Sequence, residues 1–204
     1  MDSEAYNYYN KAEERLKATG CLFMCQSKNA RFEEAIDLYE RAAQNFQQAL
    51  ILDPKDINSL NNLGYAYLNL NKLDDAFKIF YEVLALDSNY VEALIGQGIV
   101  FYKNKKYEQA IGEYKKVLEI DPINKKVNYY LGQSYYADGK YNEAIKILEK
   151  ASAEGPYFVD SLYYLGLTYQ EIGETDQAIE IFQSALIIAP GREDIKQALF
   201  KIKQ

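Results

Sequence analysis

A 34-residue block repeats four times between residues 57 and 192. Glycine recurs at that step, at Gly64, Gly98, Gly132 and Gly166. Three positions after each glycine comes a ring, at Tyr67, Phe101, Tyr135 and Tyr169, and twelve positions after it comes alanine, at Ala76, Ala110, Ala144 and Ala178. A fixed period of this length is typical of stacked units that bury their apolar faces only against their neighbours. The chain is therefore expected to be a repeat array.

Each block is predicted to form a pair of antiparallel helices. In the third block the apolar residues recur at steps of three and four, the helical period, in two stripes joined by a short turn at residues 138–140. Glycine inside a helix costs about 1 kcal/mol relative to alanine, so its recurrence suggests that two backbones approach closely. We expect Gly132 to face the small side chain of Ala144. The ring column that begins at Tyr67 is interpreted as structural.

These columns resemble the tetratricopeptide repeat, a helix–turn–helix unit with the same period. The resemblance covers residues 57–192 as four units, namely 57–90, 91–124, 125–158 and 159–192. It implies an all-α fold in which antiparallel helix pairs build a right-handed superhelical solenoid. Residues 193–204 follow the last unit, and their apolar positions predict a C-terminal capping helix that covers the last repeat.

Residues 1–56 do not fit the 34-residue frame and are expected to form a helical hairpin of their own. Apolar residues predict one helix over about 3–18 and a second over 30–52, the second being about two turns longer than a repeat helix. The connection between them is apolar at Leu22, Phe23 and Met24. It either packs on the hairpin, or is exposed and contacts membrane or a partner, or uses its two cysteines in metal or redox chemistry.

Residues 5–50 also resemble the N-terminal hairpin of the soluble NSF-attachment proteins. The run AEER at residues 12–15 and the run FEEAIDLYERAAQNF at residues 32–46 carry this resemblance. It implies an adaptor that recruits a hexameric ATPase to SNARE bundles, with an apolar loop that touches membrane. The alternative for this stretch is an irregular tetratricopeptide hairpin.

The tetratricopeptide resemblance implies a concave groove lined mainly by the first helix of each unit. A groove rich in tyrosine and isoleucine suits a peptide or helix with apolar anchors. The expected groove and groove-edge residues are Asn58, Asn61, Asn62, Tyr65, Ile95, Ile99, Tyr102, Lys126, Tyr129, Tyr130, Gln133, Tyr136, Tyr163, Tyr164 and Leu167. The family's clamp for chaperone carboxylates requires Lys and Arg beside Asn. Only Lys126 fits that pattern, so no such clamp is expected.

Composition excludes several classes of function. The 30 acidic and 23 basic residues give a net charge of −7, which argues against generic nucleic-acid binding. Histidine is absent, which removes His-based triads and His zinc sites. There is no glycine-rich phosphate loop and no apolar run of about 18 residues. We therefore expect no enzymatic activity, no cofactor, and no catalytic or metal-binding residues.

The expected function is that of a non-catalytic adaptor or scaffold that binds a protein partner, as a peptide or helix, in the groove. The alternative is an NSF-attachment-like adaptor in SNARE complex disassembly and vesicle traffic, with the SNARE bundle and its ATPase as partners. The N-terminus lacks the basic start and apolar stretch of a secretory signal, and the two cysteines suit a reducing compartment. We expect a cytoplasmic protein, with weak peripheral membrane contact through residues 22–24 in the alternative.

Overall fold

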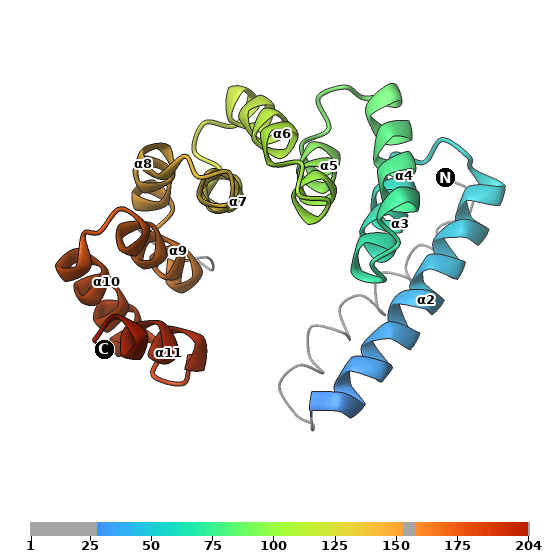
Figure 1. Cartoon of the computed structure of the whole chain (residues 1–204). Helices are drawn as coiled ribbons and strands as arrows, with labels where there is room; N and C mark the ends of the chain where they lie inside the picture. Colours follow the sequence, from blue (N-terminus) through green and yellow to red (C-terminus); the bar gives the residue numbers. More distant parts are fainter. Residues whose placement is uncertain (1–27, 153–157, 204) are drawn as a thin grey trace. The chain divides into compact units, whose positions relative to one another are not determined.

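The computed structural model describes residues 28–152 and 158–203. Within these ranges every regular element is an α-helix and no strand occurs, which confirms the expected all-α fold (Figure 1). The helices are α2 (Lys28–Leu52), α3 (Ile57–Asn69), α4 (Leu73–Leu86), α5 (Val91–Lys103), α6 (Tyr107–Ile120), α7 (Lys125–Ala137), α8 (Tyr141–Ala151), α9 (Phe158–Glu171), α10 (Thr175–Ile188) and α11 (Glu193–Ile202). The helix expected over 3–18 and the apolar connection lie outside the described residues.

Packing divides the chain into two compact units, residues 1–100 and 101–204. The first unit contains α2, α3, α4 and most of α5, and the second begins in the last turn of α5 and contains α6 to α11. In the second unit α6, α8 and α10 form one row and α7, α9 and α11 form the other (Figure 1). Helices α7 and α9 are in direct contact within their row. The division into three sequence segments, at residues 56 and 192, stays a prediction.

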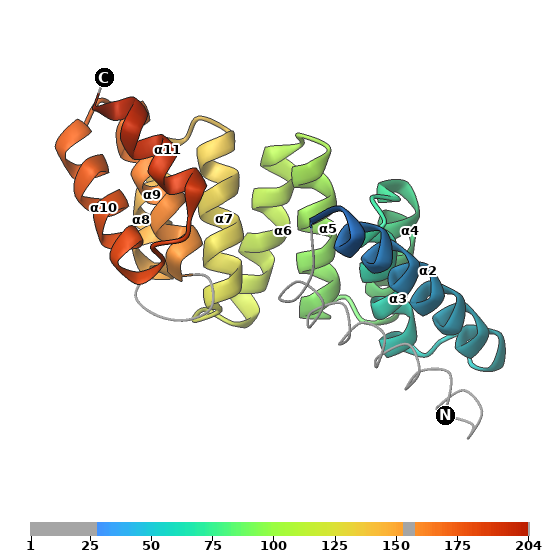
Figure 2. The ribbon, with the colours of Figure 1, turned by 90° about the horizontal axis from the view of Figure 1, so that it is seen from below.

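In the first unit the long helix α2 packs along α3 (Figure 2). Its 25 residues begin two positions before the expected start and end at the expected residue. Ala42, Ala43 and Phe46 of α2 form a buried cluster with Leu63 and Ala66 of α3. The small alanines let the two helices approach, and the Phe46 ring fills the space between them.

The turn inside each repeated pair holds one residue in the left-handed region, at the same position of every repeat. The φ angle is 57° at Asn71, 59° at Lys105, 75° at Gly139 and 82° at Gly173. The next amide closes the helix end, as where Lys140 N donates to the Tyr135 carbonyl at 2.9 Å. This bond is the Schellman closure of a helix C-terminus. Glycine takes the conformation without strain, whereas Lys105 has a Cβ there.

Side-chain caps start two of the first helices, at positions two repeats apart. Asp56 accepts a hydrogen bond from Ser59 N at 3.0 Å at the start of α3, and Asn124 accepts one from Val127 N at 3.0 Å at the start of α7. Each bond satisfies an amide that has no partner inside its own helix. These caps fix where the first helix of a pair begins.

The repeated glycines let a large side chain of the second helix reach the backbone of the first. A Cβ built on Gly132 would lie 2.5 Å from Cγ of Leu148. The expectation that Gly132 faces Ala144 is wrong, because Leu148, one turn further along α8, fills the space that the missing Cβ leaves. The same arrangement recurs at Gly64 with Phe80 and at Gly166 with Phe182. Leu148, Phe80 and Phe182 are all fully buried.

The ring column that follows the glycines joins consecutive pairs. Three of its rings, those of Tyr67, Tyr135 and Tyr169, each reach a residue 20 positions earlier, on α2 or on the second helix of the preceding pair. These contacts are Gln47 Nε2 to Tyr67 Oη at 2.7 Å, Lys115 Nζ to the Tyr135 ring centroid at 5.8 Å, and Tyr169 Oη to Glu149 Oε1 at 3.4 Å. The column therefore serves packing between pairs, as the sequence interpretation expects.

Candidate functional site

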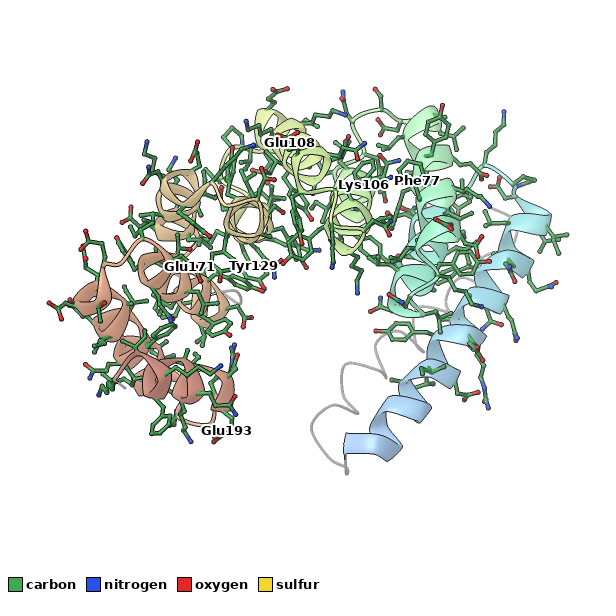
Figure 3. The ribbon with its side chains drawn as sticks, in the orientation of Figure 1. Phe77, Lys106, Glu108, Tyr129, Glu171 and Glu193 are labelled. Atoms are coloured by element: carbon green, nitrogen blue, oxygen red, sulfur yellow. The ribbon has the colours of Figure 1, made fainter. Side chains whose placement is uncertain are left out.

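The first helices of the second unit carry tyrosines at equivalent positions of successive repeats. Tyr129 on α7 is equivalent to Tyr163 on α9, and Tyr102 in the last turn of α5 is equivalent to Tyr136 on α7. Because α7 and α9 are in contact, the recurrence gathers the rings of these two helices in one place. Figure 3 shows Tyr129 on the side of α7 that faces away from α6 and α8.

Tyr164 lies at the centre of this cluster. Its ring centroid is 6.1 Å from that of Tyr129, 5.7 Å from that of Tyr136 and 5.5 Å from that of Tyr163, each in edge-to-face contact. Its hydroxyl accepts a hydrogen bond from Gln133 Nε2 at 2.6 Å and also hydrogen-bonds with Tyr102. Edge-to-face pairs contribute about 0.5–1.5 kcal/mol each beyond burial, so the cluster holds its own shape. We call Tyr102, Tyr129, Gln133, Tyr136, Tyr163 and Tyr164 the tyrosine surface.

Tyr130 is not part of the tyrosine surface but packs against it. Its ring stacks on that of Tyr114, with 5.8 Å between the centroids and 18° between the planes. Tyr114 belongs to α6 and is fully buried, so the stack is part of the packing between α6 and α7. Tyr130 also contacts Tyr129 at a centroid distance of 5.2 Å and thereby limits the orientations of that ring.

Four hydroxyls of the tyrosine surface, those of Tyr102, Tyr129, Tyr136 and Tyr163, stay protonated at neutral pH. Burial raises the pKa of Tyr136 to about 12, with the charge of Glu171 as the next cause. Burial likewise raises the pKa of Tyr102 and of Tyr129, and for both of them the next cause is Tyr164. The pKa of Tyr163 is raised by burial and by the charge of Asp194. All four are therefore neutral phenols that can donate a hydrogen bond.

Two of these donors are not used by any other described residue. Among the residues that the structure describes, the hydroxyls of Tyr136 and Tyr163 have no hydrogen-bond partner. Both side chains are half-buried. A phenol in this setting donates to water, and a ligand acceptor can replace that water at small cost.

Arg192 fixes the edge of the tyrosine surface next to the cap helix. Its guanidinium binds Asp160 at 2.7 Å and binds Asp194 through two bonds of 2.9 and 2.7 Å. It also lies 5.8 Å from the ring centroid of Tyr163. Asp160 stands at the start of α9 and Asp194 at the start of α11, so one side chain ties the cap helix to the last repeat. The hydrogen bonds from Arg192 lower the pKa of the Asp194 carboxyl.

Sequence reasoning missed Arg192, although the repeat contains a signal for it. Three repeats earlier, at the equivalent two positions, Tyr90 Oη donates to Asn58 Oδ1 at 3.1 Å. In both places the residue that precedes a first helix reaches back to the start of the previous one. The residue types differ, so only the spacing could have pointed to the contact.

The tyrosine surface continues into a hollow between α9 and α11 of about 220 Å³. Carboxylate and ammonium groups both line it, since Glu171 and Asp194 stand there with Lys201. The remaining lining residues are Tyr163, Leu167, Gln170, Gln197 and Ala198. The lining of the hollow thus combines apolar side chains, among them one tyrosine ring and one leucine, with polar groups of both charges.

The expected groove residues of the first unit make a different arrangement. Tyr65 Oη donates to the Glu92 carbonyl at 2.8 Å, so this hydroxyl bonds within the unit. Asn61 and Ile95 are only 6% and 3% exposed, which leaves little of either side chain for a partner. In the described part of the chain Asn61 Oδ1 has no hydrogen-bond partner. The groove role of these residues stays a prediction, as it does for Asn58, Asn62, Ile99, Lys126 and Leu167.

Other expectations concern membranes and metals. Leu22, Phe23 and Met24 lie outside the described residues, so the role of that connection stays a prediction. Across residues 28–152 and 158–203, no helix is long and apolar enough to cross a membrane. In the same ranges no three Cys, Asp or Glu side chains come together as metal ligands.

Family models decide what the repeats are. Two models described as tetratricopeptide repeat match the chain, one over residues 22–89 and the other over residues 101–156 and 135–202. The chain belongs to the tetratricopeptide repeat family. The resemblance drawn from the glycine, ring and alanine columns is thereby confirmed. The first match also covers part of the stretch that resembles NSF-attachment proteins, and that second resemblance stays a prediction.

Solved tetratricopeptide repeat structures share the fold of this chain. A thermophilic protein of Thermus thermophilus is 19% identical, with a TM-score of 0.71 over 94% of this chain and 98% of that one. MamA from Desulfovibrio magneticus RS-1 is 23% identical, with a TM-score of 0.67 over 94% and 98%. YrrB, described as a TPR protein with an unusual peptide-binding site, is 20% identical, with a TM-score of 0.66 over 92% and 98%. No curated protein matches the chain in sequence.

Proposed function

We propose that this tetratricopeptide repeat protein is a scaffold that binds a segment of another protein on the tyrosine surface. The observation that carries the proposal is the pair of hydroxyls on the half-buried residues Tyr136 and Tyr163, which lack hydrogen-bond partners among the described residues. Tyrosine offers a large apolar contact area with a polar tip at modest cost in side-chain entropy, which is why it is enriched in protein interfaces.

The surrounding rings support binding because they hold the site in shape before a partner arrives. Tyr164 contacts three other rings and accepts the Gln133 amide, so few side-chain rotamers remain to be ordered. Ordering a rotamer-rich side chain on binding costs about 0.5–1.5 kcal/mol. A surface whose rings are already packed avoids most of that cost. The description of YrrB, a structure with the same fold, as a protein with a peptide-binding site is in line with this proposal.

The chemistry of the surface favours binding over catalysis. A general base works best when its pKa lies near the operating pH, whereas burial raises the pKa of Tyr136 to about 12. Burial also raises the pKa of Tyr163 above its ordinary value. These phenols keep their protons at neutral pH and act as hydrogen-bond donors. The expectation of a non-catalytic protein rests on this chemistry and on the sequence.

A peptide selection tests the proposal even while the natural partner is unidentified. The full chain is immobilised, a phage-displayed library of random peptides is selected on it, and the affinities of selected peptides are measured for the parent and for the double variant Tyr136→Ala/Tyr163→Ala. We expect the double variant to weaken binding by about tenfold or more, as is usual for central interface aromatics. Circular dichroism melting checks that the variant remains folded.

Tyr81→Ala is the matched control, because Tyr81 is 64% exposed on α4 of the first unit and belongs to no part of the tyrosine surface. Selected peptides should bind this variant as tightly as the parent. The proposal is wrong if no peptide is selected, or if the selected peptides bind the double variant with unchanged affinity.

A further inference from the structure

We infer that the tyrosine surface takes a proline-rich segment in the polyproline II conformation. This inference rests on the proposed function and specifies the class of partner. Three features of the second unit carry it: the balance of hydrogen-bond donors, the packing of the helices that bear the rings and the balance of charge.

The tyrosine surface offers donors that need acceptors. Tyr136 and Tyr163 present hydroxyls with no partner among the described residues, and both are protonated at neutral pH. A polyproline II segment has no internal hydrogen bonds, and proline has no N–H, so such a segment presents carbonyl acceptors and few donors. A helical ligand satisfies its own backbone carbonyls and would leave both hydroxyls without a backbone acceptor.

The usual spacing of packed helices is compatible with this conformation. Tyr129 and Tyr163 occupy equivalent positions on α7 and α9, which are in contact. Axes of packed helices lie about 8–10 Å apart, and one polyproline II turn of three residues rises about 9.3 Å. Prolines on one edge of the segment can therefore meet successive rings, and aromatic-lined surfaces are a known means of binding such segments.

The charged groups near the surface carry both signs and sum to only −1, so they give a strongly charged segment little to bind. Arg192 already binds both Asp160 and Asp194 and lies over the Tyr163 ring. An arginine of a ligand would have to compete with Arg192 for these two carboxylates and for the ring. Of the other charged groups that line the adjoining hollow, Glu171 is acidic and Lys201 is basic. Proline carbonyls and rings match this surface better than a strongly acidic or basic segment does.

Fluorescence anisotropy on the full chain tests the inference. The probe is a capped, fluorescein-labelled oligoproline of about twelve residues, roughly 37 Å long in this conformation. A capped Gly-Ser peptide of the same length is the comparison. We expect saturable binding of oligoproline and none of the Gly-Ser peptide. Each of Tyr136→Phe and Tyr163→Phe keeps the ring and removes the donor, and should weaken binding about two- to tenfold.

Tyr81→Phe serves as the control and should leave the affinity for oligoproline unchanged. If the Phe variants bind oligoproline as tightly as the parent does, the hydroxyls are not the donors and the inference is overturned. If oligoproline does not bind, while library peptides bind and lose affinity in Tyr136→Ala/Tyr163→Ala, the proposed function stands and the proline-rich partner is wrong. If neither class of peptide binds, both proposals fail.

Discussion

At the scale of single residues, the repeats differ most clearly in the residue type that occupies the left-handed turn position. Gly139 and Gly173 occupy it in two pairs and Lys105 in another, all with positive φ. An L-residue other than glycine pays about 1–2 kcal/mol there, partly offset because glycine loses more backbone entropy on folding. We expect Lys105→Gly to raise the free energy of unfolding by about 0.5–1 kcal/mol, measured by urea denaturation. Gly139→Ala should lower it by a similar amount. A Lys105→Gly protein less stable than its parent would contradict this account.

Replacing the repeated glycine of the first helix with alanine should lower stability, whereas the same replacement at an ordinary helical glycine should raise it. In Gly132→Ala the new Cβ would lie 2.5 Å from Cγ of the buried Leu148, and overpacking of this kind costs about 1–3 kcal/mol. A Cβ built on Gly112 in α6 would meet nothing from another helix within 4 Å. Gly112→Ala should therefore stabilise the protein by up to about 1 kcal/mol. Thermal melting of both variants gives the comparison, and stabilisation by Gly132→Ala would refute the close contact.

Sequence could predict the close contact at Gly132 but not its partner. Glycine destabilises a helix relative to alanine, so a glycine that recurs in every unit indicates that another side chain or backbone packs closely against it. Whether Ala144 or Leu148 meets it depends on how the two helices cross, and side-chain spacing alone does not determine that angle. The burial of Asn61 and Ile95 could not be predicted for the same reason, because it depends on how neighbouring helices pack over these two residues.

At the scale of elements, one arginine adds polar contacts between the cap helix α11 and the last repeat. Arg192 joins Asp160 of α9 to Asp194 of α11 and contacts the Tyr163 ring. Because these groups are partly exposed, the expected loss from Arg192→Ala is about 1 kcal/mol. Hydrogen exchange of the α11 amides should become faster. Lys196→Ala removes only the exposed pair with Glu193 and should have little effect. Unchanged exchange in Arg192→Ala would show that the apolar contacts of α11 suffice.

The same arginine predicts a pH dependence. Its hydrogen bonds lower the pKa of Asp194 in the folded protein. The resulting stabilisation is present above the unfolded pKa of about 3.9 and is lost as the pH falls through the lower folded value. The stability difference between the parent and Arg192→Ala should therefore be constant near neutral pH and shrink below about pH 4. Denaturation curves across this range measure it, and a difference that grows on acidification would be evidence against the pair.

Helix existence was largely readable from the sequence, because each stripe of apolar residues had helical spacing and each turn had polar residues. The long helix α2 and the cap helix α11 illustrate this, since both were expected close to their observed bounds. The tyrosine surface was readable only as a set of positions. Its central feature, the contacts of Tyr164 with three rings, depends on rotamers that no spacing determines.

At the scale of the whole molecule, stability should be the sum of local contributions. In repeat arrays each unit contacts only its neighbours, so damage stays near its origin. Phe182 is fully buried among Leu162, Ala185 and Ile195, and Phe182→Ala should cost about 3–5 kcal/mol. Hydrogen exchange should lose protection in α9, α10 and α11 and stay unchanged in α3 and α4. Uniform loss along the chain would mean that the protein unfolds as one cooperative body.

A tyrosine-selective NMR titration of the full chain tests most directly whether a partner binds on the tyrosine surface. The ligand is a peptide obtained from the phage-display selection. Signals of the tyrosine rings, assigned through single Tyr→Phe variants, are followed as peptide is added. We predict that the signals of Tyr102, Tyr129, Tyr136, Tyr163 and Tyr164 shift together and saturate with one dissociation constant, while that of Tyr81 remains unchanged. Shifts confined to Tyr81 or to other rings outside the tyrosine surface would show that the partner binds elsewhere.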